Sequence, residues 1–123
     1  MFSLSQRSLA KLDGVNPKLA SVVKRAIELS VVDFGITEGL RSEERQLELY
    51  EQGKSQIPKG GMHCLGKAVD LMAMPDGKGS WDLMYYQQVA DAMKAAAAEL
   101  NVPIEWGGDW RTFKDGPHFE LSR

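Results

Sequence analysis

Two short segments far apart in the chain hold its only two histidines, and each histidine has a carboxylate nearby. Residues 60–71 (GGMHCLGKAVDL) contain His63 and Asp70, and residues 115–120 (DGPHFE) contain His118. On one helix, His63 and Asp70 would lie roughly 10 Å apart, too far for both to bind one ion at about 2 Å. The glycines around His63 and the apolar run at 67–72 instead predict a loop and a strand that bring Asp70 back beside the histidine.

His118 is predicted to lie on another strand, residues 117–121, because Pro117 favours an extended approach and His118 alternates with Phe119. Two imidazoles and one carboxylate favour zinc over manganese or cobalt, and three protein ligands leave a fourth position open for water. An open position favours catalysis. Asp115 is then our candidate for the base that takes a proton from the attacking water.

The residues alone leave other interpretations open. Each histidine could lie in an ordinary surface loop, since Asp-Gly-Pro is a common turn sequence. Cys64 follows His63 directly, so the chain could instead use a cysteine nucleophile, with His118 as its base and Asp115 orienting that base. The simpler role for Cys64 is that of a small apolar side chain.

Both segments resemble the signature motifs of the VanY-type zinc peptidases, which include D-Ala-D-Ala carboxypeptidases and phage L-alanyl-D-glutamate endopeptidases. The matching residues are His63-x-x-Gly66-x-Ala68-x-Asp70 and Asp115-x-Pro117-His118-Phe119-Glu120. A third stretch of that family is similar to Gly39-Leu40-Arg41-Ser42 followed by Gln46, Leu49, Tyr50 and Gly53. The resemblance spans about residues 31–121.

The resemblance implies a set of zinc ligands, namely His63, Asp70 and His118. It implies that Asp115 is the catalytic base. Two positions depart from the family pattern: Gly61 stands where many relatives carry serine, and Asp115 stands where many carboxypeptidases carry glutamate. The second departure is more similar to the endolysin branch than to the carboxypeptidase branch.

The resemblance also implies that Arg41 is a cationic clamp for a substrate carboxylate or for the oxyanion of the reaction. By position alone, Arg41 would be a surface arginine paired with Glu38 or Glu44. Gln46, one turn into the following helix, is expected to face the same cleft and to bind substrate.

Helical periodicity and capping residues predict helices at residues 5–12, 17–30, 43–52 and 82–100, with Asn16 and Ser42 as N-caps. Apolar and β-branched runs predict strands at 31–38, 67–72, 102–106 and 117–121. Residues 54–61 are predicted to form a loop near the site, and Trp106 and Trp110 either wall the substrate groove or cover the core. These elements predict an α+β fold: a small antiparallel sheet with helices packed mainly on one face and the zinc site at the sheet.

Length and composition narrow the function further. The 123 residues are expected to form a single catalytic domain, residues 1–123, without a separate cell-wall-binding domain. A formal charge of −2 argues against a nucleic-acid partner, and one cysteine excludes an intrachain disulfide. The N-terminus does not resemble a signal peptide, and no apolar run is long enough for a membrane span. We therefore expect a monomer that stays in the cytoplasm of the bacterial host until its release to the cell wall.

The sequence thus predicts a zinc-dependent peptidoglycan peptidase that hydrolyses the L-Ala-D-Glu bond of the stem peptide and acts as a phage endolysin in host-cell lysis. The enzymatic alternative is a D-Ala-D-Ala carboxypeptidase. The alternative outside enzymology is a non-catalytic, zinc-stabilised module that binds the cell wall.

Overall fold

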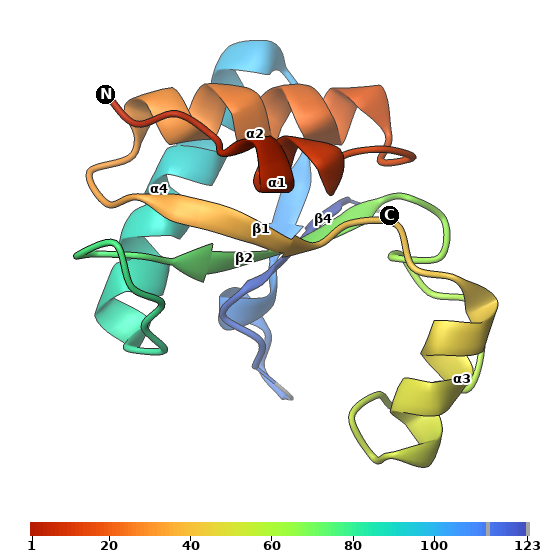
Figure 1. Ribbon diagram of the computed structural model, residues 1–123. Coiled ribbons are helices and arrows are strands. Elements are labelled where there is room, and N and C mark those ends of the chain that lie inside the picture. The colour runs from red at the N-terminus through yellow and green to blue at the C-terminus, as the bar shows by residue number, and fades with distance from the viewer. Residues whose placement is uncertain (113, 123) are drawn as a thin grey trace.

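The computed structural model of the protein describes residues 1–112 and 114–122 (Figure 1). In chain order the elements are α1 (Gln6–Ala10), α2 (Pro17–Leu29), β1 (Phe34–Glu38), α3 (Glu43–Glu51), β2 (Ala68–Ala73), α4 (Leu83–Leu100), β3 (Ile104–Trp106), the 3-10 helix η1 (Gly107–Asp109) and β4 (His118–Leu121). Within these residues, no helix combines the length and the apolar character that crossing a membrane requires.

The strands of the described residues form one antiparallel sheet in the order β1-β2-β4-β3. The last strand of the chain, β4, lies between β2 and β3, and α4 provides the connection from β2 to β3. This order places the segment that follows residue 115 beside the strand that carries Asp70. The predicted convergence of two distant segments is therefore a property of the sheet topology.

One face of the sheet packs against α2 and α4 to form the apolar core. The strands contribute Phe34, Ile36, Val69, Leu71, Ala73 and Phe119, and the helices contribute residues such as Val22, Val23, Val89 and Met93. Because neighbouring side chains of a strand point to opposite faces, residues that alternate with these core positions are left for the other face. The predicted α+β fold, with helices mainly on one face, is confirmed, and α3 lies apart from the other helices (Figure 1).

Side chains at the helix N-termini explain why the predicted helices form where they do. Asn16 accepts a hydrogen bond from the Lys18 amide, with Pro17 as the first helical residue of α2. Ser42 caps α3 by accepting a hydrogen bond from the Arg45 amide. The second cap matters for the site, because it begins the helix directly after Arg41.

All four strands begin later than the sequence predicts, β2 and β4 by one residue and β1 and β3 by two or more. The predicted strand at 31–38 begins at Phe34, because the Ser30 hydroxyl donates to the Val32 carbonyl over 2.6 Å and closes a local turn. The predicted strand at 102–106 begins at Ile104, because Asn101 adopts a left-handed conformation with φ of 59° at the end of α4.

Candidate metal centre

The candidate site lies on the sheet face opposite α2 and α4. On that face Asp70 of β2 pairs in register with His118 of β4 on one side and with Glu38 of β1 on the other. The register of β1 shifts between Ile36 and Glu38, so that Glu38 instead of Thr37 stands opposite Asp70. A row of polar side chains thus crosses three neighbouring strands.

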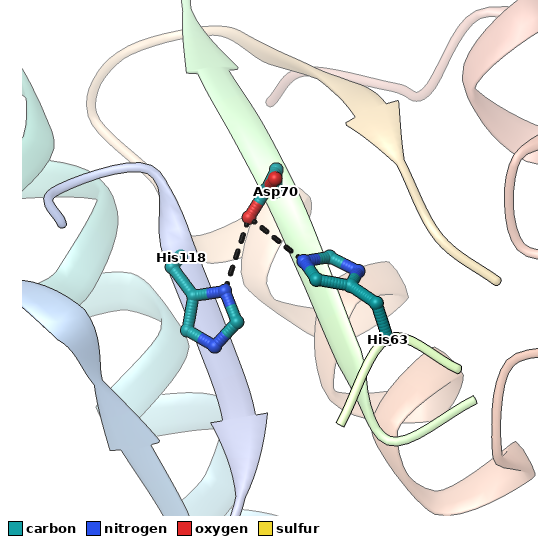
Figure 2. Close-up of side chains that lie close together, drawn as sticks. All are labelled: His63, Asp70 and His118. Atoms are coloured by element: carbon teal, nitrogen blue, oxygen red, sulfur yellow. Dashed lines mark hydrogen bonds and ion pairs between the residues drawn. The ribbon is translucent and has the colours of Figure 1, made fainter. Parts of the chain in front are cut away.

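His63 reaches this row from the loop before β2 (Figure 2). The loop turns at Gly66, which has a φ of 71°, and a Cβ at this position would meet the Gly14 carbonyl oxygen at 2.5 Å. Only glycine fits such a close approach. The Gly66 carbonyl in turn accepts a hydrogen bond from the Asn16 amide over 2.7 Å, which ties the loop to the start of α2. The loop-and-strand arrangement predicted for His63 and Asp70 is confirmed.

The three predicted ligands converge on one point. Asp70 Oδ1 lies 3.2 Å from His63 Nε2 and 3.2 Å from His118 Nδ1 (Figure 2). One ligand atom from each residue lies within 4.8 Å of the other two. Both imidazoles are buried, with exposed fractions of 6% and 8%. Such spacing is compatible with a single ion at about 2 Å from each atom.

The outer nitrogen of each imidazole determines which atom is free to bind a metal. His63 Nδ1 lies 2.9 Å from the Gly39 carbonyl oxygen, which can only accept, so Nδ1 carries a proton and Nε2 is the ring atom that faces Asp70. His118 Nε2 lies 2.9 Å from the Glu120 carboxylate, which fixes Nδ1 as the atom that faces Asp70.

The donor set therefore fits a cation. Three atoms that carry lone pairs repel one another at this distance unless a positive charge, a proton or a metal ion, lies between them. Imidazoles that bind metal usually donate their other N–H to a carbonyl or a carboxylate, and both kinds of partner are present. His63 through Nε2, Asp70 through its carboxylate and His118 through Nδ1 would hold zinc and leave one position open.

The site also shifts the pKa values of its own groups. Burial of Asp70 would raise the pKa of its carboxyl group, but hydrogen bonds with His118 and His63 outweigh burial and keep that pKa below its usual range. Burial would lower the pKa of His118, but Asp70 and then Glu120 raise it above the usual imidazole value. A bound metal ion would compete with the proton that His118 holds under this influence.

Asp115 lies in the tight turn that precedes β4. Its amide donates to the Gly107 carbonyl over 3.0 Å, and its carbonyl accepts from the His118 amide over 3.1 Å. A Cβ at Gly107 would meet the Asp115 carbonyl oxygen at 2.3 Å, so the approach requires glycine. Burial, followed by the charge of Asp70, raises the pKa of Asp115. Asp115 thus lines the site cavity as a partly desolvated acid.

Arg41 lies between β1 and α3, where it contacts Glu38 and Gln46 and is directed toward Asp70. Its Nε donates to Glu38, and its Nη1 donates to Gln46 Oε1 over 2.8 Å. Its Nη2 lies 4.0 Å from Asp70 Oδ2. The pairing with Glu38 is therefore real, yet the guanidinium faces the candidate metal centre. The predicted partner Glu44 is not among the ion pairs of the described residues.

These side chains open into one cavity of about 570 Å³. Arg41, Gln46, Asp115 and Trp110 line it together with the candidate ligands, and part of the predicted loop at 54–61 forms one wall. Trp110 lies against His118, with 5.2 Å between the ring centroids. Trp106, by contrast, is buried and stacks on Phe119 at 6.3 Å, so it covers the core and does not wall the groove.

Glu120 and Glu38 were missed as site residues from the sequence. Glu120 is 2% exposed and contacts His118. A signal was available, because residues two apart on a strand share a face, and a carboxylate two residues after a candidate ligand can support it. Glu38 offered no such signal, since its place opposite Asp70 depends on the register shift in β1.

Cys64 does not have the surroundings of a nucleophile. Its Sγ lies 3.9 Å from the Ser42 carbonyl oxygen, and Cys64 is not among the residues that line the cavity. Burial, followed by the charge of Glu43, raises the pKa of the thiol. A raised pKa disfavours the reactive thiolate. The geometry thus supports the metal interpretation over the cysteine interpretation.

Comparisons with known proteins agree with this geometry. The model of the phage L-alanyl-D-glutamate peptidase family matches residues 1–122. The L-alanyl-D-glutamate peptidase of Escherichia phage T5 is 33% identical over 125 aligned residues, covering 99% of this chain and 90% of that protein. The crystal structure of the L-Ala D-Glu endopeptidase ChiX of Serratia marcescens superposes with a TM-score of 0.92 at 45% identity, covering 98% of this chain and 90% of the other.

A more distant structure shares the fold. The vancomycin-resistance D,D-pentapeptidase VanY, solved in complex with Zn(II), superposes with a TM-score of 0.59 at 16% identity. That match covers 87% of this chain and 72% of the other. It supports the VanY-type architecture that the sequence motifs suggested.

Proposed function

The chain belongs to the phage L-alanyl-D-glutamate peptidase family, and we propose that it hydrolyses the bond between L-alanine and D-glutamate in the stem peptide of peptidoglycan. The observation that carries this proposal is the convergence of His63 Nε2, Asp70 Oδ1 and His118 Nδ1 beside a partly buried Asp115. The family match identifies the bond that is cleaved. The geometry of the three ligand atoms and Asp115 supports metal-assisted hydrolysis as the reaction.

The proposed cofactor is zinc, held by His63, Asp70 and His118. When bound, zinc would act as a Lewis acid toward the substrate carbonyl and lower the pKa of its bound water to about 7. The zinc-bound state of a structure with the same fold supports this choice. The outer partners of both imidazoles, the Gly39 carbonyl and the Glu120 carboxylate, keep the coordinating nitrogens aimed at Asp70.

Two other side chains of the cavity would transfer protons and stabilise negative charge during the reaction. Asp115 accepts a proton from the attacking water and returns it to the leaving amine of D-glutamate. Its burial favours this work, because a raised pKa makes the carboxylate a stronger base. Arg41 directs Nη2 toward the site, where it would stabilise the negative charge on the carbonyl oxygen or on a substrate carboxylate. The residues predicted to bind substrate, Arg41 and Gln46, both line this cavity.

Digestion of purified muropeptides followed by mass spectrometry tests the proposed bond. Cleavage next to the L-alanine attached to the sugar supports the proposal, whereas release of free alanine would identify a D-Ala-D-Ala carboxypeptidase. A non-catalytic wall-binding module would bind the substrate and leave it intact. The matched control is Asp115→Asn, which keeps the ligands but removes the base.

We also propose that the 123 residues act as one catalytic domain and that the enzyme works as a phage endolysin in host-cell lysis. The reported relatives are a phage enzyme and a bacterial enzyme. Expression in a bacterial host, with and without a protein that permeabilises the inner membrane, tests this role. Lysis only when the membrane is opened would support it, and intact cells in both cases would contradict it.

A further inference from the structure

Gln46 is a buried carboxamide whose polar atoms are all used inside the protein. Its side-chain oxygen accepts from Arg41 Nη1 over 2.8 Å, and its Nε2 donates to Ser55 Oγ over 2.7 Å and to the Ile57 carbonyl over 2.8 Å. The residue is 2% exposed. An amide nitrogen has two hydrogens, so no donor of Gln46 is left for a substrate. A direct substrate contact is therefore not the best account of this residue.

The partners fix the orientation of the amide without ambiguity. Arg41 can only donate, so the oxygen of Gln46 must face it, and the Ile57 carbonyl can only accept, so the nitrogen must face the loop. One planar group is thereby held at both ends. A rotation that served one partner would break the contact with the other.

Arg41 depends on this contact for its direction. Its guanidinium is held at Nε by Glu38 and at Nη1 by Gln46, so the plane of the group is set by two neighbours. The remaining edge, Nη2, is the one that faces Asp70, at 4.0 Å. Planar groups with fixed donors are the usual means of recognising a carboxylate.

The loop at 54–61 depends on the same amide. Ser55 and Ile57 both line the cavity, and Gln46 is the buried side chain that holds them. The other ties lie at the ends of the loop, where the Lys54 amide donates to the Leu49 carbonyl and the Gly60 amide donates to Glu43. Loss of the central tie would free the wall of the cavity between them.

We infer that Gln46 is a positioning residue that holds Arg41 and the 54–61 loop in one arrangement and acts on the substrate only through them. This inference rests on the proposed function for its substrate. A glutamyl residue has two carboxyl groups and the stem peptide continues through one, so the other remains a carboxylate close to the bond that is cleaved. Arg41 Nη2 binds that carboxylate, and Gln46 holds Nη2 in the position that this contact requires.

The experiment uses two synthetic stem tripeptides that differ only in this group, a free carboxylate in one and a carboxamide in the other. The wild-type chain is expected to have a higher kcat/KM for the carboxylate peptide. Gln46→Met should lower this preference roughly tenfold, because a charged hydrogen bond is misaligned. Gln52→Met is the matched control, since Gln52 is exposed at the end of the same helix and should leave the preference unchanged.

Trypsin provides a second measurement that does not depend on activity, because the loop contains Lys54 and Lys59. Gln46→Met and Ser55→Ala should each accelerate cleavage at these lysines about fivefold, since opening of the loop precedes cleavage. Ser55→Ala should leave the carboxylate preference intact, because the Gln46–Arg41 contact remains. If Gln46→Met unfolds the whole protein, trypsin will also cleave inside α2 and α4. In that case only Ser55→Ala tests whether the side chain of Gln46 holds the loop.

Two results would overturn the inference: an equal loss of kcat/KM on both peptides in Gln46→Met with unchanged trypsin cleavage, or no acceleration of loop cleavage in Ser55→Ala. The first would make Gln46 a direct substrate contact. Failure of the wild-type chain to cleave either peptide would instead refute the proposed function, while the trypsin measurement would still report on the loop.

Discussion

Asp70 and His118 stand directly opposite each other on β2 and β4, with 3.2 Å between Oδ1 and Nδ1. The strand order sets this relationship, because β4 is inserted beside β2 although 48 residues separate the two side chains in the chain. The His63 loop, which precedes β2, completes the site. The candidate metal centre is thus formed by side chains from two neighbouring strands, β2 and β4, and from one loop.

Asp115→Asn is expected to keep zinc and lose activity. The substitution preserves the shape of the side chain and removes the base, so kcat should fall at least about 100-fold. Zinc content measured on the same preparation should remain that of the wild type, since Asp115 is not a ligand. An active Asp115→Asn enzyme would contradict the assigned base.

Glu120→Gln is expected to weaken zinc binding by about 10- to 100-fold, because the buried carboxylate that supports His118 loses its charge. Competition with a chromophoric chelator measures this change. Glu105→Gln is the matched control, because Glu105 stands opposite Glu120 in the register of β3 and β4 but is exposed. Equal zinc affinity in both variants would mean that Glu120 does not support the ligand.

Cys64→Ser is expected to retain activity within about twofold, because the side chain lies outside the cavity lining and small changes there cost little. A zinc chelator should abolish the activity of both the variant and the wild type. The reverse pattern, an inactive variant and a chelator-resistant wild type, would restore the cysteine mechanism.

Tyr86 should make the stability of the fold sensitive to alkaline pH. Its hydroxyl donates to the Ser80 carbonyl over 2.7 Å, accepts from the Ala73 amide over 3.3 Å, and is buried. Burial raises the pKa of Tyr86. The folded state therefore holds the phenol proton more tightly, so this stability is complete below the unfolded pKa of about 10 and is lost as the pH rises above it.

Tyr86→Phe should cost about 1–3 kcal/mol at neutral pH, because the buried Ala73 amide and the partly buried Ser80 carbonyl both lose their partner. The variant should also lose less stability than the wild type between about pH 8 and about pH 10.5. Urea unfolding at both pH values measures the two effects. Tyr50→Phe, at a tyrosine that is 45% exposed, is the control and should behave as the wild type.

Local signals explain what the sequence could predict. The helix caps Asn16 and Ser42 lie next to the helices they begin, and the glycines around His63 mark its loop. The alternation of His118 with Phe119 identified β4. Each of these signals depends on a few consecutive residues, so a single sequence carries it.

Long-range contacts explain what the sequence could not predict. The place of Glu38 opposite Asp70 depends on one extra residue in β1, and the partners of Gln46 depend on the path of the 54–61 loop. Trp106 packs on Phe119 because β3 and β4 are neighbours. None of these contacts can be recognised from the residues that lie next to them in the sequence.

The central claim is that His63, Asp70 and His118 bind one zinc ion. Equilibrium dialysis against zinc, followed by elemental analysis, tests it on the wild type and on His63→Ala, Asp70→Ala and His118→Ala. We predict one tightly bound zinc per wild-type chain and none in any of the three variants, each confirmed as folded by circular dichroism. A wild-type chain without zinc, or variants that bind it as tightly, would contradict the account.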